Sequence, residues 1–192
     1  MAPQLLRLLH SGVILTTVQK ASVKNTAYLS LGANINNPAL QVSEAINRLK
    51  TLGFVESVSS FYSTEPMELT EQPWFLNCSL KLCTGLDPGT LLHGLLKIED
   101  DMGRERSQSK GPRIIDIDLL LYNADVIDKP DLQVPHPAMT RRRFVLAPLA
   151  EIAPNAWHPV LHKTALELLN DLGEGGGTVH KLDFLSKTMR RA

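Results

Sequence analysis

One short apolar segment that holds two aspartates constrains this chain more than any other stretch. Residues 114–122 read IIDIDLLLY, and Asp116 and Asp118 are their only charged members. Side chains alternate between the two faces of a strand, so both aspartates point the same way, with Cα atoms about 6.5 Å apart. The opposite face then carries Ile115, Ile117, Leu119 and Leu121. The segment predicts a sheet with one face for a core and one face for a charged ligand.

Two parallel carboxylates suit divalent cations. Mg²⁺ prefers a few carboxylates completed by phosphate oxygens, and paired ions lie about 3.5–4 Å apart in such sites. The residues just before the segment supply the cations Arg104, Arg106, Lys110 and Arg113. Arginines for phosphate beside carboxylates for metal indicate transfer of a phosphoryl group from a nucleotide. Two alternatives stay open here: the solvated face of a half-exposed strand, and a salt bridge to Arg113.

A second alternating segment predicts a binding surface for a flat heterocycle. In residues 75–83, the even-numbered positions Leu76, Cys78, Leu80 and Leu82 face a core. Phe75 and Asn77 then share the other face, where an aromatic ring can stack on a heterocycle and a carboxamide can match its edge. A core phenylalanine and an edge-strand asparagine are simpler alternatives.

Three separated motifs resemble one enzyme family. GPRIIDIDLL at residues 111–120, VPHP at 134–137 and RRFVL at 142–146 are similar, in sequence and in order, to the 6-hydroxymethyl-7,8-dihydropterin pyrophosphokinases of folate biosynthesis. The resemblance covers about residues 26–159. It implies an enzyme, a transferase that moves the terminal diphosphate of ATP to the hydroxymethyl oxygen of the pterin and releases AMP. Its implied partners are ATP as co-substrate, the pterin and two Mg²⁺ ions.

The resemblance also assigns roles to individual residues. The implied catalytic set is Asp116, Asp118, Arg104 and Arg113, with the two aspartates as the Mg²⁺ ligands. The implied nucleotide-binding set is Glu99, Arg106, Ile115, His136 and Arg142. The implied pterin-binding set is Thr64, Met67, Phe75, Asn77 and Phe144. Without the resemblance, Glu99 would be read as a solvated glutamate, His136 as an ordinary loop histidine and Phe144 as a core residue.

The order of periodic segments predicts the fold. Strands are expected near residues 26–31, 54–62, 75–83 and 114–122, and helices near 38–52 and 87–102. Asn37 and Asp87, each followed by a proline, are expected to cap the two helices. The order is that of a ferredoxin-like βαββαβ sandwich, an α+β fold with helices on one face of an antiparallel sheet. The free face would carry Phe75, Asn77, Asp116 and Asp118.

Additions are expected after the last strand. They are a short partner strand around residues 126–127, a short helix or turn from Arg141, and a helix from about 164 to 172. Two proline-containing loops, 62–73 and 104–113, are expected to close over the substrates, as in the resembling family. Closure would exclude water that could hydrolyse the activated phosphate.

Composition excludes some function classes. The chain has 192 residues, a net charge of 0 and a pI near 7.0, so it is sized for one domain and lacks the basic field of a nonspecific nucleic-acid binder. Cys78 and Cys83 are five positions apart on one expected strand, on opposite faces, so they should not bridge. No apolar run approaches the roughly 18 residues that span a bilayer. We expect a monomer without nucleic-acid or membrane partners.

The ends of the chain form separate predicted segments. Residues 1–24 contain Arg7, Lys20 and Lys24 but no acid, as in an organellar presequence; a disordered extension and an early start codon are the alternatives. We expect an extension at 1–24, the pyrophosphokinase domain at 25–172 and a tail at 173–192. The location would be cytoplasmic, or mitochondrial if residues 1–24 act as a presequence. The competing functions are a sheet that binds nucleic acid and a nucleotidyl transferase, which would release pyrophosphate.

Overall fold

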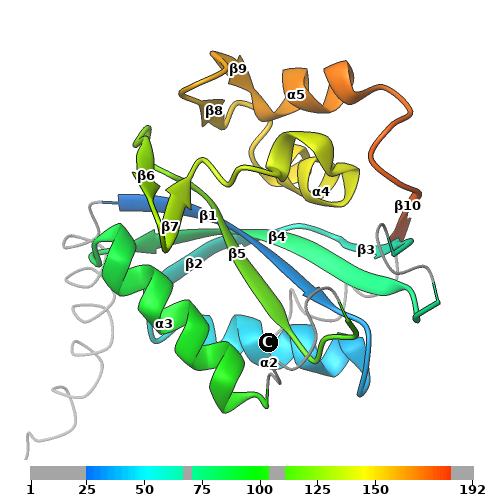
Figure 1. The fold of residues 1–192 in the computed structure, drawn as a ribbon. Coiled ribbons are helices and arrows are strands. Elements are labelled where there is room, and N and C mark those ends of the chain that lie inside the picture. Colours follow the sequence, from blue (N-terminus) through cyan, green and yellow to red (C-terminus); the bar gives the residue numbers. More distant parts are fainter. Residues whose placement is uncertain (1–24, 67–70, 104–110, 183–192) are drawn as a thin grey trace, which may run out of the picture.

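The computed structural model describes residues 25–66, 71–103 and 111–182 (Figure 1). Its centre is a sheet of six strands, β1 (Asn25–Ala33), β2 (Phe54–Val58), β3 (Phe61–Thr64), β4 (Phe75–Thr84), β5 (Asp116–Tyr122) and β10 (Val179–Leu182). The strand order is β10-β3-β4-β1-β5, and β2 also pairs with β4. Every pair in the sheet is antiparallel. The predicted ferredoxin-like α+β fold is therefore confirmed.

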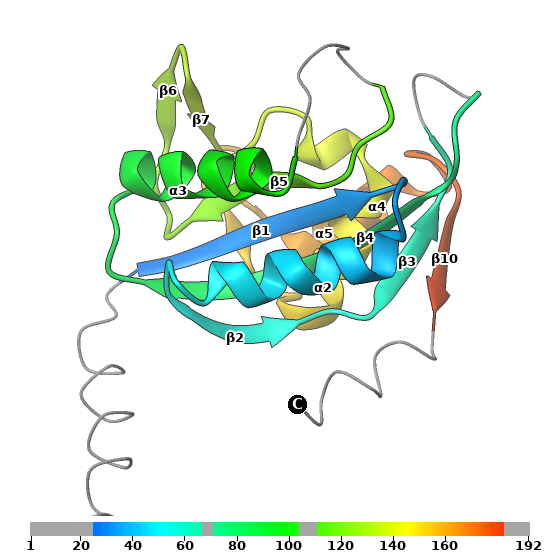
Figure 2. The same cartoon turned by 90° about the horizontal axis from the view of Figure 1, so that it is seen from below.

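Helices cover both faces of this sheet. The pair α2 (Pro38–Leu49) and α3 (Pro88–Asp101) lies on one face, and Figure 2 shows the two helices side by side across it. The pair α4 (Arg143–Ile152) and α5 (Ala165–Leu172) lies on the other face (Figure 1). We expected that second face to be free for ligand, and this was wrong for the part that α4 covers. No helix in the described part of the chain is long and apolar enough to cross a membrane.

The smaller elements lie between β5 and α5. Two hairpins, β6 (Ile127–Lys129) with β7 (Leu132–Val134) and β8 (Trp157–His158) with β9 (Lys163–Thr164), each form a separate two-stranded sheet. A single 3₁₀ turn, η1 (Met139–Arg141), precedes α4. The prediction that the strand near residues 126–127 would pair with the strand before it was wrong, because β6 pairs with β7 instead.

The main core lies between the sheet and the helices α2 and α3. Its members on β1, Leu29 and Leu31, and on β4, Leu80 and Leu82, are fully buried. The helices contribute Val42, Ala45, Leu49, Leu91, Leu95 and Ile98. Burial of an aliphatic side chain of this size stabilises the fold by about 1.5–3 kcal/mol. The alternation of apolar residues along two strands and the stripes on two helices therefore meet in one core, as the sequence pattern predicted.

A second core lies under α4 and α5, and it corrects the expected orientation of Leu121. Leu120 and Leu121 both pack there with Met139, Leu146 and Leu149, whereas Ile117 and Leu119 pack in the main core. The cause is a bulge between β5 and β1, because Tyr28 pairs with Leu121 while the next residue, Leu29, pairs with Leu119. One extra residue in β5 reverses the alternation beyond it.

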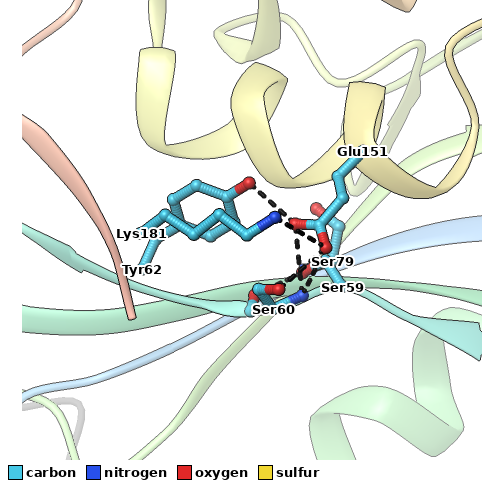
Figure 3. A network of polar contacts seen from close by, with 6 residues as sticks. All are labelled: Ser59, Ser60, Tyr62, Ser79, Glu151 and Lys181. Atoms are coloured by element: carbon cyan, nitrogen blue, oxygen red, sulfur yellow. Dashed lines mark hydrogen bonds and ion pairs between the residues drawn. The ribbon is translucent and has the colours of Figure 1, made fainter. Parts of the chain in front are cut away.

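The predicted strand 54–62 is broken into β2 and β3 at Ser59 and Ser60. Figure 3 shows the Glu151 carboxylate of α4 pointing toward Ser60 and Tyr62 at this break. It accepts hydrogen bonds from the Ser60 amide (3.1 Å), the Ser60 hydroxyl (2.8 Å) and the Tyr62 hydroxyl (2.7 Å). The Lys181 ammonium of β10 lies 3.4 Å from the same carboxylate. This polar network joins α4 to β3 and β10.

Several element ends also differ from the predictions. β1 continues through Gly32 and Ala33, and α4 continues through the buried Pro148, because α4 packs its apolar residues in the second core. Asp87 caps α3 as expected, by accepting hydrogen bonds from the Gly89 and Thr90 amides. Asn37 has a left-handed backbone with φ of 61° and makes no side-chain capping bond, so that prediction was wrong.

Two further expectations concern the cysteines and the tail. Cys78 and Cys83 do not form a disulfide, as predicted. The expected tail at 173–192 supplies a strand of the main sheet, because β10 pairs with β3 from Val179 opposite Thr64 to Leu182 opposite Phe61.

Candidate active site

A cavity of about 670 Å³ opens on the sheet face beside the start of α4, a size typical of small-molecule sites. The predicted residues that line it are Thr64, Phe75, Asn77, Arg113, Asp116, Asp118, His136, Arg142 and Phe144. They come from β3, β4 and β5, from the loops before β5 and α4, and from the first turn of α4. The fold therefore brings together residues that are up to 80 positions apart in the sequence.

The acidic end of the cavity is built on β5. The Arg113 guanidinium forms an ion pair with Asp116, so the salt bridge that stayed open from the sequence is present. Asp118 Oδ2 lies 3.8 Å from Arg142 Nη1 and 4.0 Å from His136 Nε2. Burial, together with the neighbouring charge of Asp116, raises the pKa of Asp118 above its ordinary value. Both aspartates thus face one space and repel each other there.

This donor set fits a hard divalent cation. No group of three or more His, Cys, Asp and Glu side chains that could hold a metal is found within residues 25–66, 71–103 and 111–182. Two carboxylates whose remaining ligands come from phosphate oxygens are nevertheless the arrangement that Mg²⁺ accepts. Burial and the charge of Asp116 raise the pKa of Asp118, and a bound divalent cation would relieve the repulsion between the two carboxylates.

His136 is held rigidly beside Asp118. Its amide donates to the Leu120 carbonyl at 2.9 Å, and its Nδ1 accepts from the Ala138 amide at 3.2 Å. Since Nδ1 accepts a bond, Nε2 is the nitrogen that carries the proton and faces Asp118 in the neutral ring. Burial lowers the pKa of His136, and the Asp118 charge opposes that shift. A neutral imidazole can donate one hydrogen bond into the cavity from a fixed direction.

The other end of the cavity is lined by the Asn77 carboxamide and by two aromatic rings. The Asn77 amide donates to Thr64 Oγ1 at 2.6 Å, which fixes the carboxamide against β3. Gly32 of β1 leaves the required room, because a Cβ at that position would lie 2.4 Å from Asn77 Oδ1. Phe75 and Phe144 also line the cavity, and the Arg142 guanidinium carbon lies 5.6 Å from the centre of the Phe144 ring. The predicted aromatic and carboxamide pair is therefore present on one face.

Buried Asn34 joins the chain on two sides of the cavity. Its side-chain Oδ1 accepts a hydrogen bond from the Arg113 backbone amide at 2.7 Å, and its backbone amide donates to the Arg113 carbonyl at 3.0 Å. Its Nδ2 donates to Gln72 Oε1 at 3.1 Å and to the Pro73 carbonyl at 3.0 Å. The asparagine thereby positions Arg113. The sequence offered one signal, a polar residue directly after an apolar strand, to which we assigned no role.

Two predicted residues lie elsewhere, and three lie outside the described residues. Glu99 is fully buried and accepts a hydrogen bond from the Ile117 amide at 2.7 Å, so the solvated alternative is wrong. Ile115 is fully buried in the main core, so only its backbone can face a ligand. The roles assigned to both stay predictions. Met67, Arg104 and Arg106 fall in the stretches that the structure does not describe.

Several lining residues were not predicted. Ser30 pairs with Asp118 across β1 and β5, and Gly32 pairs with Asp116. The same alternation that located the aspartates would have found both, because Leu29 and Leu31 point to the core. Glu65, Gln72 and Arg141 also line the cavity, but they lie on loops and turns that carry no periodic signal.

Comparisons with known proteins point to one family. The family model described as 7,8-dihydro-6-hydroxymethylpterin-pyrophosphokinase (HPPK) matches residues 28–154. A 2-amino-4-hydroxy-6-hydroxymethyldihydropteridine pyrophosphokinase of Aquifex aeolicus is 39% identical over 142 residues, which are 74% of this chain and 89% of that protein. The corresponding Bacillus subtilis protein is 42% identical over 132 residues, 68% of this chain and 79% of that protein.

Longer proteins are also similar. The folic acid synthesis protein FOL1 of Dictyostelium discoideum is 40% identical over 158 residues, 82% of this chain but only 24% of that protein. The chain therefore spans about a quarter of the length of that relative. A crystal structure of wild-type Plasmodium falciparum HPPK-DHPS with pteroate has a TM-score of 0.63 and 20% identity, over 77% of this chain and 42% of that one. At this identity the match supports the fold.

Proposed function

Because this chain belongs to the 7,8-dihydro-6-hydroxymethylpterin-pyrophosphokinase family, we propose that it transfers the diphosphate of ATP to the hydroxymethyl group of 6-hydroxymethyl-7,8-dihydropterin, releases AMP and serves folate biosynthesis. The observation that carries the proposal is the two-ended cavity. One end holds two aspartates with arginines and a histidine, and the other holds an asparagine and two phenylalanines. These ends match the triphosphate of one substrate and the flat ring of the other.

At the acidic end, Asp116 and Asp118 would hold two Mg²⁺ ions. Bound there, the ions would neutralise phosphate charge. Arg113 and Arg142 already lie against the two carboxylates and can turn their planar donors to phosphate oxygens. His136 would add one donor from a fixed direction. The role of these residues is to keep the triphosphate in line with the attacking oxygen.

At the amide-lined end, the pterin would lie between Phe75 and Phe144 with its edge against Asn77. The Thr64 hydroxyl, which accepts from the Asn77 amide, fixes which atoms of the carboxamide remain for the pterin. The hydroxymethyl oxygen would form a bond to the β-phosphorus as the bridging oxygen departs on AMP. Holding both groups in this geometry supplies most of the acceleration, by positioning and by charge stabilisation.

Product analysis tests the proposal. Purified protein is incubated with ATP, Mg²⁺ and 6-hydroxymethyl-7,8-dihydropterin, and the nucleotide and pterin products are separated. AMP and the pterin diphosphate should appear in equal amounts, and only when the pterin is present. Release of pyrophosphate would favour a nucleotidyl transferase instead. A folded protein that forms no AMP with the pterin would overturn the proposal.

We further propose that the protein works as a monomer, without nucleic acid or membrane, in the cytoplasm or, if residues 1–24 act as a presequence, in mitochondria. The net charge of 0 and the composition support the absence of a nucleic-acid partner. Light scattering at the assay concentration tests the oligomeric state, and the location of a C-terminal fluorescent fusion tests the compartment. Activity that depends on the square of the Mg²⁺ concentration would support two ions.

A further inference from the structure

The C-terminal strand β10 and the residue before it, Thr178, hold the chain at both ends of the connection between β3 and β4. Where the chain leaves β3, the Glu65 amide donates to the Thr178 carbonyl at 3.2 Å, and the Thr178 hydroxyl donates to the Glu65 carboxylate at 2.9 Å. Where the chain enters β4, the Trp74 and His180 rings stack, with centroids 5.7 Å apart and planes 4° apart. The short segment from Thr178 to His180, which leads into β10, thus touches the connection on both sides.

β10 is itself fixed to the body of the fold. It pairs with β3 over four residue pairs, from Val179 opposite Thr64 to Leu182 opposite Phe61. The Lys181 ammonium lies 3.4 Å from the Glu151 carboxylate of α4, in the network of Figure 3. A contact with β10 is therefore a contact with the rigid sheet, so His180 can hold Trp74 in place.

The stacked rings lie behind the cavity wall. Residues that pair directly across antiparallel strands share a face, so Thr64 and Val179 belong to the cavity face, and Ser63 and His180 belong to the opposite face. Thr64, Glu65 and Phe75 line the cavity, whereas Trp74 and His180 are not among the described residues that line it. Any effect of the stack on a ligand must therefore pass through its neighbours in the chain.

Those neighbours form one side of the proposed pterin site. Thr64 pairs with Phe75 across β3 and β4, so Glu65 and Trp74 are the next residues outward from this pair on the two strands. Trp74 keeps 45% of its surface exposed, and the stack against His180 is the aromatic contact that fixes its ring. The backbone that presents the Phe75 ring is held from behind by the stack.

We propose that Trp74 and His180 are positioning residues for the pterin side of the cavity: their stack fixes the start of β4 so that Phe75 meets the pterin face at the required angle. This inference rests on the proposed function. Offset aromatic stacks contribute enough to change a binding constant by about two- to tenfold. The stack should affect pterin binding and leave the phosphate end unchanged, because Asp116, Asp118 and Arg142 lie on other elements.

The chain offers a matched control for the experiment. Trp157 and His162 form a second exposed Trp–His pair, with centroids 6.1 Å apart, in the hairpin of β8 and β9. His180→Ala and Trp74→Ala should each raise the KM for the pterin by about two- to tenfold, with kcat and the KM for ATP nearly unchanged. His162→Ala and Trp157→Ala should leave all three constants as in the wild type. His180→Phe, which keeps a ring for stacking, should restore the pterin KM.

Calorimetric titration with 6-hydroxymethylpterin, in the presence of a non-hydrolysable ATP analogue, gives the same comparison without turnover. If His180→Ala and Trp74→Ala bind this pterin as tightly as the two control variants, the positioning role is overturned. It is equally overturned if His180→Phe remains as weak as His180→Ala, since the ring would not be the cause. A wild-type protein that forms no AMP with the pterin would instead contradict the proposed function.

Discussion

Two aspartates in the cavity are suited to bind a cation but reduce the stability of the folded state. Asp116 and Asp118 lie on one face of β5, and burial together with the charge of Asp116 raises the pKa of Asp118. An acid whose pKa is raised by folding destabilises the folded state at neutral pH, where it is ionised. Arg113 and Arg142 offset part of that cost.

We expect Asp118→Asn to lower kcat by at least about 100-fold, because a neutral amide is a poor Mg²⁺ ligand. The melting temperature should be equal to or higher than that of the wild type, because the variant removes one of two repelling charges. Activity assays and calorimetry measure the two effects, and exposed Asp125→Asn is the control. A variant that retains activity, or that unfolds, would contradict the metal-binding role.

Gly32 gives a second prediction at this scale. Gly32→Ala brings a Cβ within 2.4 Å of Asn77 Oδ1, so the carboxamide must move and its bond to Thr64 must weaken. We expect a loss of about 1–3 kcal/mol in the free energy of unfolding and a higher KM for the pterin. Urea unfolding and steady-state kinetics measure both. A normal pterin KM would show that the position of Asn77 is unimportant.

Alternation located the sheet residues of the site because the face on which a strand residue lies depends only on its position within the strand. Asp116, Asp118, Phe75 and Asn77 follow from a period of two, and Ser30 would have followed as well. Loop residues such as Gln72 carry no period. Their place in the site depends on partners far along the chain, such as Asn34, which is 38 positions away.

At the scale of elements, predictions failed where a distant side chain decides the backbone. Residues 54–62 were predicted as one strand, yet the strand breaks at Ser60, whose amide bonds to Glu151, 91 positions away. The alternation of β5 likewise fails at the bulge, and the bulge is recognised only from the pairing of β5 with β1. Local patterns predict that an element exists, and tertiary contacts decide where it is interrupted.

The break leads to a prediction with a pH dependence. Burial would raise the pKa of Glu151, but the hydrogen bonds from Tyr62 and Ser60 together lower it below the ordinary value of 4.5. The carboxylate therefore contributes stability above about pH 4.5, and this contribution is lost as the pH falls through the lowered pKa. We expect Glu151→Gln to cost about 1–3 kcal/mol at pH 7.

Urea denaturation of the wild type and of Glu151→Gln at several pH values from 7 to 3 measures this stability difference. The difference between wild type and Glu151→Gln should shrink at acidic pH. The control is Glu44→Gln, which removes an exposed pair with Arg48 on α2 and should change stability by no more than about 0.5 kcal/mol. A difference that does not depend on pH would show that the charge of Glu151 contributes nothing.

At the scale of the whole molecule, the sequence predicted the βαββαβ unit but not what covers it. The elements from β1 to β5 came in the expected order, with the second expected strand divided into β2 and β3. β10 has only four residues, VHKL, and follows a glycine-rich stretch, so it was assigned to a tail. A strand this short is recognisable only by its partner, β3.

Truncation tests the place of β10 in the molecule. A chain that ends at residue 172 loses β10, leaves β3 as an unpaired edge and removes Lys181 from Glu151. We expect it to lose at least about 1 kcal/mol, a fall of roughly 2–4 °C in melting temperature for a protein of this size. A chain that ends at Leu182 keeps β10 and is the reference for the comparison. Equal melting of all three would show that β10 is dispensable.

The bulge between β1 and β5 also fixes the register in which these two strands pair. A strand that slides by one residue turns every side chain to the other face, which here would exchange the aspartates with the buried isoleucines. The extra residue of β5 fits opposite Tyr28 and Leu29, at one position along β1. If β5 slipped along β1, the bulge would have to form at another position, where the two strands now pair regularly. The irregularity that confounds the sequence pattern thereby keeps both carboxylates on the cavity side.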